Sequence, residues 1–210
     1  MSTQPTEEGS SDKEGIFAPV VGHDGAKAIL RSGLRRGDIH LMLTGEKGSG
    51  KTVALLAIEE AIDGAEYVDA RGFTERKLRD KLAQNPPALL IDEFDNMKTD
   101  AFKALNTALE QGRVTKNVTG DSYDKEIDTQ VFVACNYPDQ IAGDVKDRFV
   151  SVEFEPYTRS EFIEVCEVLL PQQVEWVAEA SNSAEIARSI AEVVWDETDS
   201  RSPRTARDAA

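Results

Sequence analysis

The 210-residue chain has a hydrophobic fraction of 40%, enough for a folded core, and a net charge of −15 from 24 Lys and Arg residues against 39 Asp and Glu residues. A surface this acidic repels phosphate backbones unless basic groups are concentrated locally, and it is typical of halophile proteins, whose stability should fall when KCl is lowered from molar concentrations. No apolar stretch approaches the ~20 residues of a membrane-spanning helix, and the N-terminus lacks an apolar signal segment, so we expect a cytoplasmic protein without a membrane partner.

Local composition and periodicity predict the elements of the first half of the chain. Residues 1–15 are polar, charged and rich in Gly and Ser, which indicates a disordered N-terminal tail. Apolar periodicity then predicts helices at 24–36, 51–62, 74–84 and 98–110, and strands at 39–43, 67–69 and 88–91.

The second half begins with a hairpin and ends in helices. Two polar strands at 113–119 and 123–127 flank the turn signal Gly120-Asp121. Further buried strands are expected at 131–135 and 151–154, followed by helices at 159–169, 172–180 and 183–195 and a last helix from Ser202.

Strands that alternate with helices predict an α/β fold with a parallel sheet. We expect five parallel strands between helices over residues 16–156. The helical remainder, 157–210, has the size of a small lid subdomain.

The strongest motif follows the first predicted strand and opens the next helix. It matches G-x-x-x-x-G-K-[ST] and consists of Gly45, Glu46, Lys47, Gly48, Ser49, Gly50, Lys51 and Thr52. In such a loop (Walker A, or P-loop) backbone N–H groups surround phosphates, the lysine contacts the β- and γ-phosphates, and the threonine hydroxyl binds Mg²⁺. The helix N-terminus adds a favourable dipole for the anion. The motif therefore predicts binding of ATP with Mg²⁺.

A second motif stands at the end of the strand predicted at 88–91, where an apolar run is followed by Asp92 and Glu93. Beside a P-loop, such a pair corresponds to a Walker B motif. We expect Asp92 to hold Mg²⁺ and Glu93 to polarise the attacking water.

Together these motifs resemble the AAA+ ATPase family over nearly the whole chain from residue 17. The segment 133–136 resembles the sensor 1 strand, which implies that Asn136 orients the hydrolytic water. Asp147-Arg148-Phe149 resembles the segment that carries the arginine finger, although Asp stands where Ser is commonest. Arg148 would then reach the γ-phosphate of a neighbouring subunit; the alternative is a surface arginine paired with Asp144 or Asp147.

The resemblance extends to both ends of the ordered chain. Segment 202–206 is similar to the start of a sensor 2 helix, which would bring Arg204 to phosphate. Segment 17–23 is similar to the wall of an adenine site, with Val20, Val21 and Gly22 as its members. The family also implies a homo-oligomer, usually a ring. Because the chain ends soon after Arg204, in what should be mid-helix, both a truncated chain and a minimal family member remain open.

The branch of the family is indicated by 91–97 and 108–115, which resemble MCM helicases and RuvB-like and MoxR-like proteins. In the helicases a hairpin before sensor 1 touches DNA, and here it would offer Lys116, Asn117 and Lys125. Several acids share this hairpin, so a hairpin that serves subunit packing is the alternative. The leading hypothesis is an oligomeric ATP-driven motor on DNA. The alternatives are a MoxR-like ATPase that remodels protein partners, and a nucleotide-gated loader or initiator module.

Overall fold

The computed structural model describes residues 15–118, 121–198 and 202–210. The predicted N-terminal tail, apart from its last residue, and the tip of the predicted hairpin lie outside these ranges. Side chains of residues 117, 118 and 121 are also outside the description. None of the described helices is both long enough and apolar enough to cross a membrane.

A five-stranded parallel sheet forms the centre of the molecule, as the sequence predicts. Its strand order is β2-β3-β6-β1-β7. The strands are β1 (His40–Gly45), β2 (Glu66–Asp69), β3 (Ala88–Asp92), β6 (Gln130–Cys135) and β7 (Phe149–Phe154). β1, β3 and β6 are almost fully buried, because helices cover both faces of the sheet.

Side-chain alternation along the strands gives each face of the sheet its own apolar core. Leu41, Leu43 and Phe132 point to the face covered by α1 (Asp24–Arg36) and α2 (Lys51–Ala61). Met42 and Val133 point to the opposite face, which α3 (Glu75–Leu82) and α4 (Thr99–Gln111) cover. The sheet is therefore a rigid platform between two helical layers.

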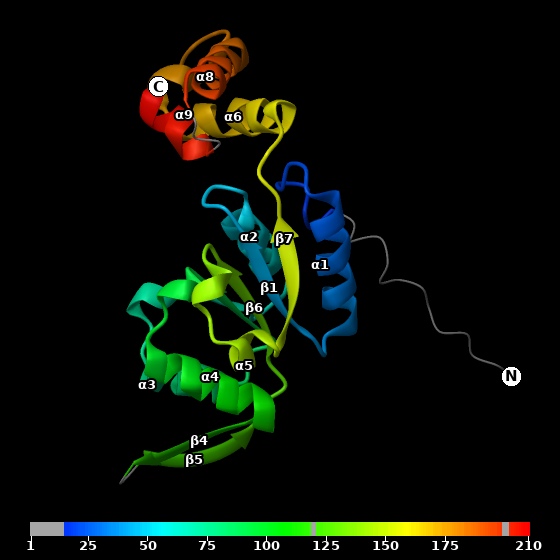
Figure 1. Ribbon diagram of the computed structural model, residues 1–210, viewed down its shortest axis with the longest axis vertical. Coiled ribbons are helices and arrows are strands. Elements are labelled where there is room, and N and C mark those ends of the chain that lie inside the picture. The colour runs from blue at the N-terminus through cyan, green and yellow to red at the C-terminus, as the bar shows by residue number, and fades with distance from the viewer. Residues whose placement is uncertain (1–14, 119–120, 199–201) are drawn as a thin grey trace, which may run out of the picture.

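The predicted hairpin is present as an antiparallel pair, β4 (Arg113–Val118) and β5 (Asp121–Glu126). It extends beside α3 and α4 at one end of the molecule, while the C-terminal helices lie at the other end (Figure 1). A short helix, α5 (Gly143–Lys146), precedes β7.

The C-terminal helices pack around a separate apolar cluster that includes Phe162, Leu170 and Val194. They are α6 (Arg159–Gln173), α7 (Glu175–Ala178), α8 (Ser183–Glu197) and α9 (Pro203–Ala209). A Thr158–Glu161 capping box starts α6. The helix expected over 172–180 is present as α7 but is shorter and covers only 175–178. α6 continues past Pro171 to residue 173, since proline removes one N–H donor while the amide of Val174 still bonds to Leu170 O.

Candidate nucleotide site

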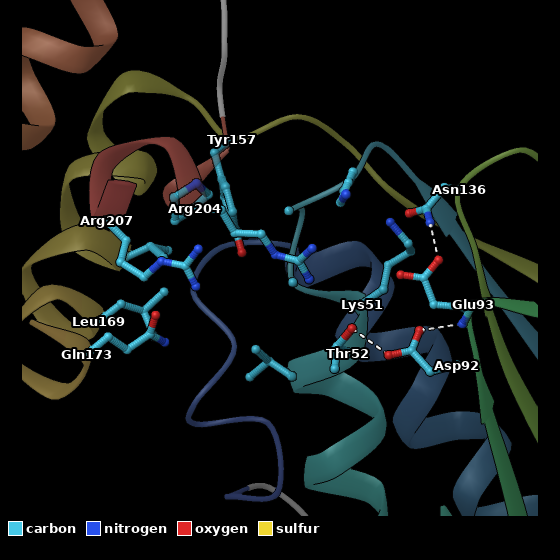
Figure 2. A pocket seen from close by; sticks show the side chains of 16 residues that line it. Lys51, Thr52, Asp92, Glu93, Asn136, Tyr157, Leu169, Gln173, Arg204 and Arg207 are labelled. Atoms are coloured by element: carbon cyan, nitrogen blue, oxygen red, sulfur yellow. Dashed lines mark hydrogen bonds between the residues drawn. The ribbon is translucent and has the colours of Figure 1, made fainter. Parts of the chain in front are cut away.

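A cavity of about 460 Å³ lies between the loop after β1 and the C-terminal helices. Its core side contributes the Gly-rich loop, the start of α2 and the ends of β3 and β6; its other side comes from Tyr157, α6 and α9 (Figure 2). The lining residues are Lys47, Gly48, Gly50, Lys51, Thr52, Val53, Asp92, Glu93, Asn136, Tyr157, Val165, Leu169, Gln173, Pro203, Arg204 and Arg207.

The Gly-rich loop adopts backbone angles that side chains resist. Gly48 and Gly50 have φ values of 91° and 93°, in the left-handed region that favours glycine. Both also lie close to the part of the chain that follows β7. A Cβ built on Gly48 would stand 2.3 Å from Ser202 Oγ, and one on Gly50 would stand 2.6 Å from the Tyr157 hydroxyl oxygen. The loop therefore requires glycine at these positions for both conformation and space.

Lys51 is buried at the first turn of α2, with its ammonium turned onto the loop itself. Its Nζ donates to Gly45 O at 2.8 Å, to Glu46 O at 2.7 Å and to Ser49 Oγ at 3.3 Å. Burial lowers the pKa of Lys51 to about 8, while the nearby Asp92 carboxylate opposes that shift. A phosphate group that replaced these neutral acceptors would favour the charged ammonium.

Asp92 ends β3 within hydrogen-bonding distance of the P-loop threonine. Thr52 Oγ1 donates to Asp92 Oδ2 at 2.7 Å, Tyr67 donates its hydroxyl to the same oxygen at 2.9 Å, and Glu93 N–H donates to Oδ1 at 2.7 Å. Burial raises the pKa of Tyr67, and the hydrogen bond to the Asp92 carboxylate raises it further. A hydroxyl and a carboxylate oxygen side by side are the hard ligands that Mg²⁺ prefers, so the residues present fit this cation.

Glu93 faces the cavity beside Asn136, which follows β6. Asn136 Nδ2 donates to Glu93 Oε2 at 3.4 Å, and Asn96 Nδ2 donates to the same oxygen at 3.1 Å. Glu93 has a φ of 53°, an uncommon value for a residue with a side chain, and such values concentrate at functional sites. The Asn136 backbone is itself fixed by an N–H bond to Asp95 Oδ1 at 3.0 Å.

The C-terminal helices bring two arginines to the cavity. Arg204 and Arg207 lie three residues apart on α9 and share one face of it. Tyr157, just before α6, also lines the cavity. Its ring centroid lies 5.1 Å from that of His23, and burial raises the pKa of Tyr157 to about 12. Arg204 was expected here from the sequence, whereas Arg207 and Tyr157 were not.

Val20, Val21 and Gly22, which the sequence suggests as the wall of an adenine site, are not among the residues that line this cavity. Val20 is buried with the helices α1 and α2, and Val21 packs against the apolar cluster of the C-terminal helices. Gly22 lies against the Glu161 side chain. The two valines pack into the apolar cores because burial removes their side chains from water.

Arg148 lies away from the cavity, at the start of β7 beside α4. Its Nε donates to Asn106 Oδ1 at 3.4 Å and its Nη2 pairs with Glu110 Oε1 at 3.2 Å. The alternative expected from the sequence is a surface ion pair of Arg148 with Asp144 or Asp147. Among the described residues the ion pair of Arg148 is with Glu110 instead. An arginine in this place does not complete the cavity of its own chain.

The hairpin cations expected to contact DNA bind other parts of the chain. Lys116 is 9% exposed and pairs with Asp80 Oδ1 at 2.9 Å, while Lys125 Nζ donates to Ala83 O at 2.9 Å. Arg113 pairs with Asp124 at 2.6 Å. The contacts of Lys116 and Lys125 hold the hairpin on α3, whereas the Arg113–Asp124 pair joins its two strands, and none of them favours the expected DNA contacts. The side chain of Asn117 lies outside the description.

Several residues of the site carry no recognisable signal in the sequence, and one carries a weak signal. Tyr67, Asn96 and Gln173 belong to no motif, and each reaches the site through tertiary packing. Arg207 had a usable signal, because a residue three positions after Arg204 on a helix shares its face.

The comparisons with known proteins agree with this geometry. Residues 41–157, more than half of the chain, match the ATPase family associated with various cellular activities (AAA). A replication factor C small subunit of Staphylothermus marinus is 26% identical over 174 residues, 75% of this chain and 46% of the relative. DNA replication licensing factor mcm5-A of Xenopus laevis is 31% identical over 133 residues, 54% of this chain and 18% of the relative. The chain thus spans less than half the length of either relative.

Solved structures show the same fold. The RuvB Holliday junction branch migration motor of Thermotoga maritima aligns with a TM-score of 0.59 and 18% identity, over 90% of this chain and 68% of that one. A closed-state reconstruction of Hsp104 with ATPγS and casein aligns with a TM-score of 0.72 and 16% identity, over 96% and 47%. With its Gly-rich loop, its paired strand-end acids and this family match, the chain belongs to the AAA family of ATPases.

Proposed function

We propose that this chain hydrolyses ATP in an assembly of identical copies and uses the energy to act on DNA. The observation that carries the proposal is the division of the site. Lys51, Asp92, Glu93 and Asn136 face one cavity, while Arg148 lies elsewhere on the same chain.

The Gly-rich loop is the proposed phosphate site. The α2 N-terminus presents its dipole to the triphosphate, and Lys51 exchanges its loop carbonyls for phosphate oxygens. The Thr52 hydroxyl and the Asp92 carboxylate would hold Mg²⁺, which when bound neutralises charge on the phosphates.

Glu93 is the proposed group that orients and polarises the attacking water. Its carboxylate accepts a proton from water as the water oxygen attacks the γ-phosphorus and the bond to the β-phosphate oxygen breaks. Asn136 donates to the same carboxylate and can hold the water in line. Arg204 and Arg207 place positive charge at the cavity from the helical lid that we propose for residues 157–210.

Arg148 is proposed to act on the site of a neighbouring copy. It occupies the face formed by α4 and the start of β7, where Asn106 and Glu110 hold its guanidinium. A copy docked on this face could insert its nucleotide next to Arg148, so that transition-state charge is stabilised only in the assembly. Turnover per chain should then rise with protein concentration.

DNA is the proposed substrate because the relatives of this chain include a replication factor C small subunit and a DNA replication licensing factor. One specific observation favours a protein partner as the second candidate. The hairpin lysines Lys116 and Lys125 are engaged by α3 and by the loop after it, and the chain carries a net charge of −15. Both features weaken phosphate contact by this surface.

The test is ATP turnover over a range of protein concentrations in high KCl, with single-stranded, double-stranded or no DNA. Glu93→Gln gives the background, since the amide cannot accept the proton. Turnover that rises with concentration and again with DNA supports the proposal. Concentration-dependent turnover that ignores DNA would favour the protein partner, and turnover no higher than that of Glu93→Gln would refute hydrolysis by this chain.

A further inference from the structure

The cavity has two chemically different ends. Lys51, Asp92 and Asn136 lie together at one end, where the proposed function places the phosphates (Figure 2). Leu169 and Gln173 lie at the opposite end, away from these groups. A nucleotide that sets its triphosphate on the loop therefore extends its base toward α6.

One face of α6 lines this far end. Val165, Leu169 and Gln173 recur every four residues, and such residues lie above one another on a helix. The first two are apolar and at least half-buried, which suits the flat faces of a base. Gln173 is exposed, its side-chain amide points toward the cavity, and it makes no hydrogen bond with the described residues (Figure 2). The Gln173 amide can therefore donate and accept hydrogen bonds with the edge of a base.

Arg207 is the other polar group at this end, and the two would favour different bases. Arginine pairs with O6 and N7 of guanine, whereas glutamine pairs with N6 and N7 of adenine. The guanidinium of Arg207 is bonded to Asp208 Oδ1 through Nε at 2.9 Å and Nη2 at 2.6 Å. Because the Arg207 guanidinium already donates to Asp208, we expect the side-chain amide of Gln173 to be the group that bonds to the base.

We propose that Gln173 is a specificity-determining residue that recognises adenine. Its carbonyl oxygen accepts from the N6 amino group, and its NH₂ group donates to N7. Guanine has the acceptor O6 where adenine has the N6 amino group. In the same orientation of the amide, the carbonyl oxygen of Gln173 would therefore face O6, and two acceptors cannot form a hydrogen bond. This inference rests on the proposed ATP site and adds to it the group that selects the base.

The experiment measures the dissociation constants of ATPγS and GTPγS by calorimetry, with Mg²⁺, for the full chain and three variants. Gln173→Ala should reduce the preference for ATPγS by about fivefold or more, the effect of one lost bidentate pair. Gln173→Arg should shift the preference toward GTPγS. Gln172→Ala is the matched control, since this neighbouring glutamine is also exposed on α6 but does not line the cavity.

The outcomes separate the two claims. Wild type that prefers ATPγS, with Gln173→Ala alone losing the preference, supports the inference. If Gln173→Ala keeps the wild-type ratio, or if Gln172→Ala changes it equally, the assignment of Gln173 is wrong while the ATP site stands. If wild type binds neither nucleotide, the proposed function fails and the inference fails with it. Melting curves of the variants confirm that each is folded.

Discussion

Replacing Gly48 by alanine should weaken ATP binding through two separate effects. The position has a φ of 91°, and a left-handed conformation costs a residue with a Cβ about 1–2 kcal/mol. The added methyl would also stand 2.3 Å from Ser202 Oγ and 2.9 Å from Ser202 Cβ, so the start of α9 must move away from the loop. That displacement adds about 1 kcal/mol.

We expect the loop of the variant to relax away from this conformation, so ATP binding must restore it at a cost of about 2–3 kcal/mol, which corresponds to an affinity about 30- to 150-fold weaker. Calorimetric titration with ATPγS measures it. The double variant Gly48→Ala, Ser202→Gly removes the collision with the serine side chain while the backbone cost remains. Replacing the serine N-cap of α9 by glycine costs only a few tenths of a kcal/mol. We therefore expect the double variant to bind ATPγS up to about fivefold more tightly than Gly48→Ala. Wild-type affinity in Gly48→Ala, or no recovery in the double variant, would refute contact between the loop and α9.

Three further predictions concern charge and position. Because burial lowers the pKa of Lys51 to about 8 and phosphate favours its charged form, ATPγS affinity should be full below pH 8 and fall by up to about tenfold per unit above it; a Lys51→Met variant titrated at the same pH values should lack this fall. Asn96→Ala should lower kcat by about three- to tenfold with KM for ATP unchanged, because Asn96 bonds to Glu93 and does not line the cavity; a change in KM alone would contradict this. Lys116→Ala should lower the melting temperature by about 2–4 °C through loss of its contact with Asp80; unchanged melting together with lost DNA stimulation would assign the lysine to DNA instead.

The core of the site could be predicted because it follows from local sequence and one topological rule. Lys51 and Thr52 open a helix after β1, Asp92 ends β3, and Asn136 follows β6. The carboxyl ends of parallel strands meet at one edge of a sheet, so residues 40 and more positions apart in the chain become neighbours.

Other parts of the site depend on how helices dock, which a single sequence does not specify. Gln173 is an ordinary exposed polar residue until α6 is placed over the loop. The contacts of the hairpin differ in this respect, because strand alternation in the sequence already indicates which of its side chains face α3. Val114 and Lys116 share one face of β4 by strand alternation, and the burial of Val114 draws Lys116 toward α3. The stem of a lysine can be buried in this way while its ammonium finds a carboxylate.

The most direct test of a site shared between copies is a mixing experiment with two variants. Glu93→Gln retains Arg148, and Arg148→Ala retains Glu93, so each should hydrolyse ATP poorly by itself. In a mixed assembly, some sites combine Glu93 of one variant with Arg148 of the other and are complete. We predict that turnover of an equimolar mixture clearly exceeds the sum of the separate variants. A mixture that only equals this sum, or Arg148→Ala alone at wild-type turnover, would contradict the shared site.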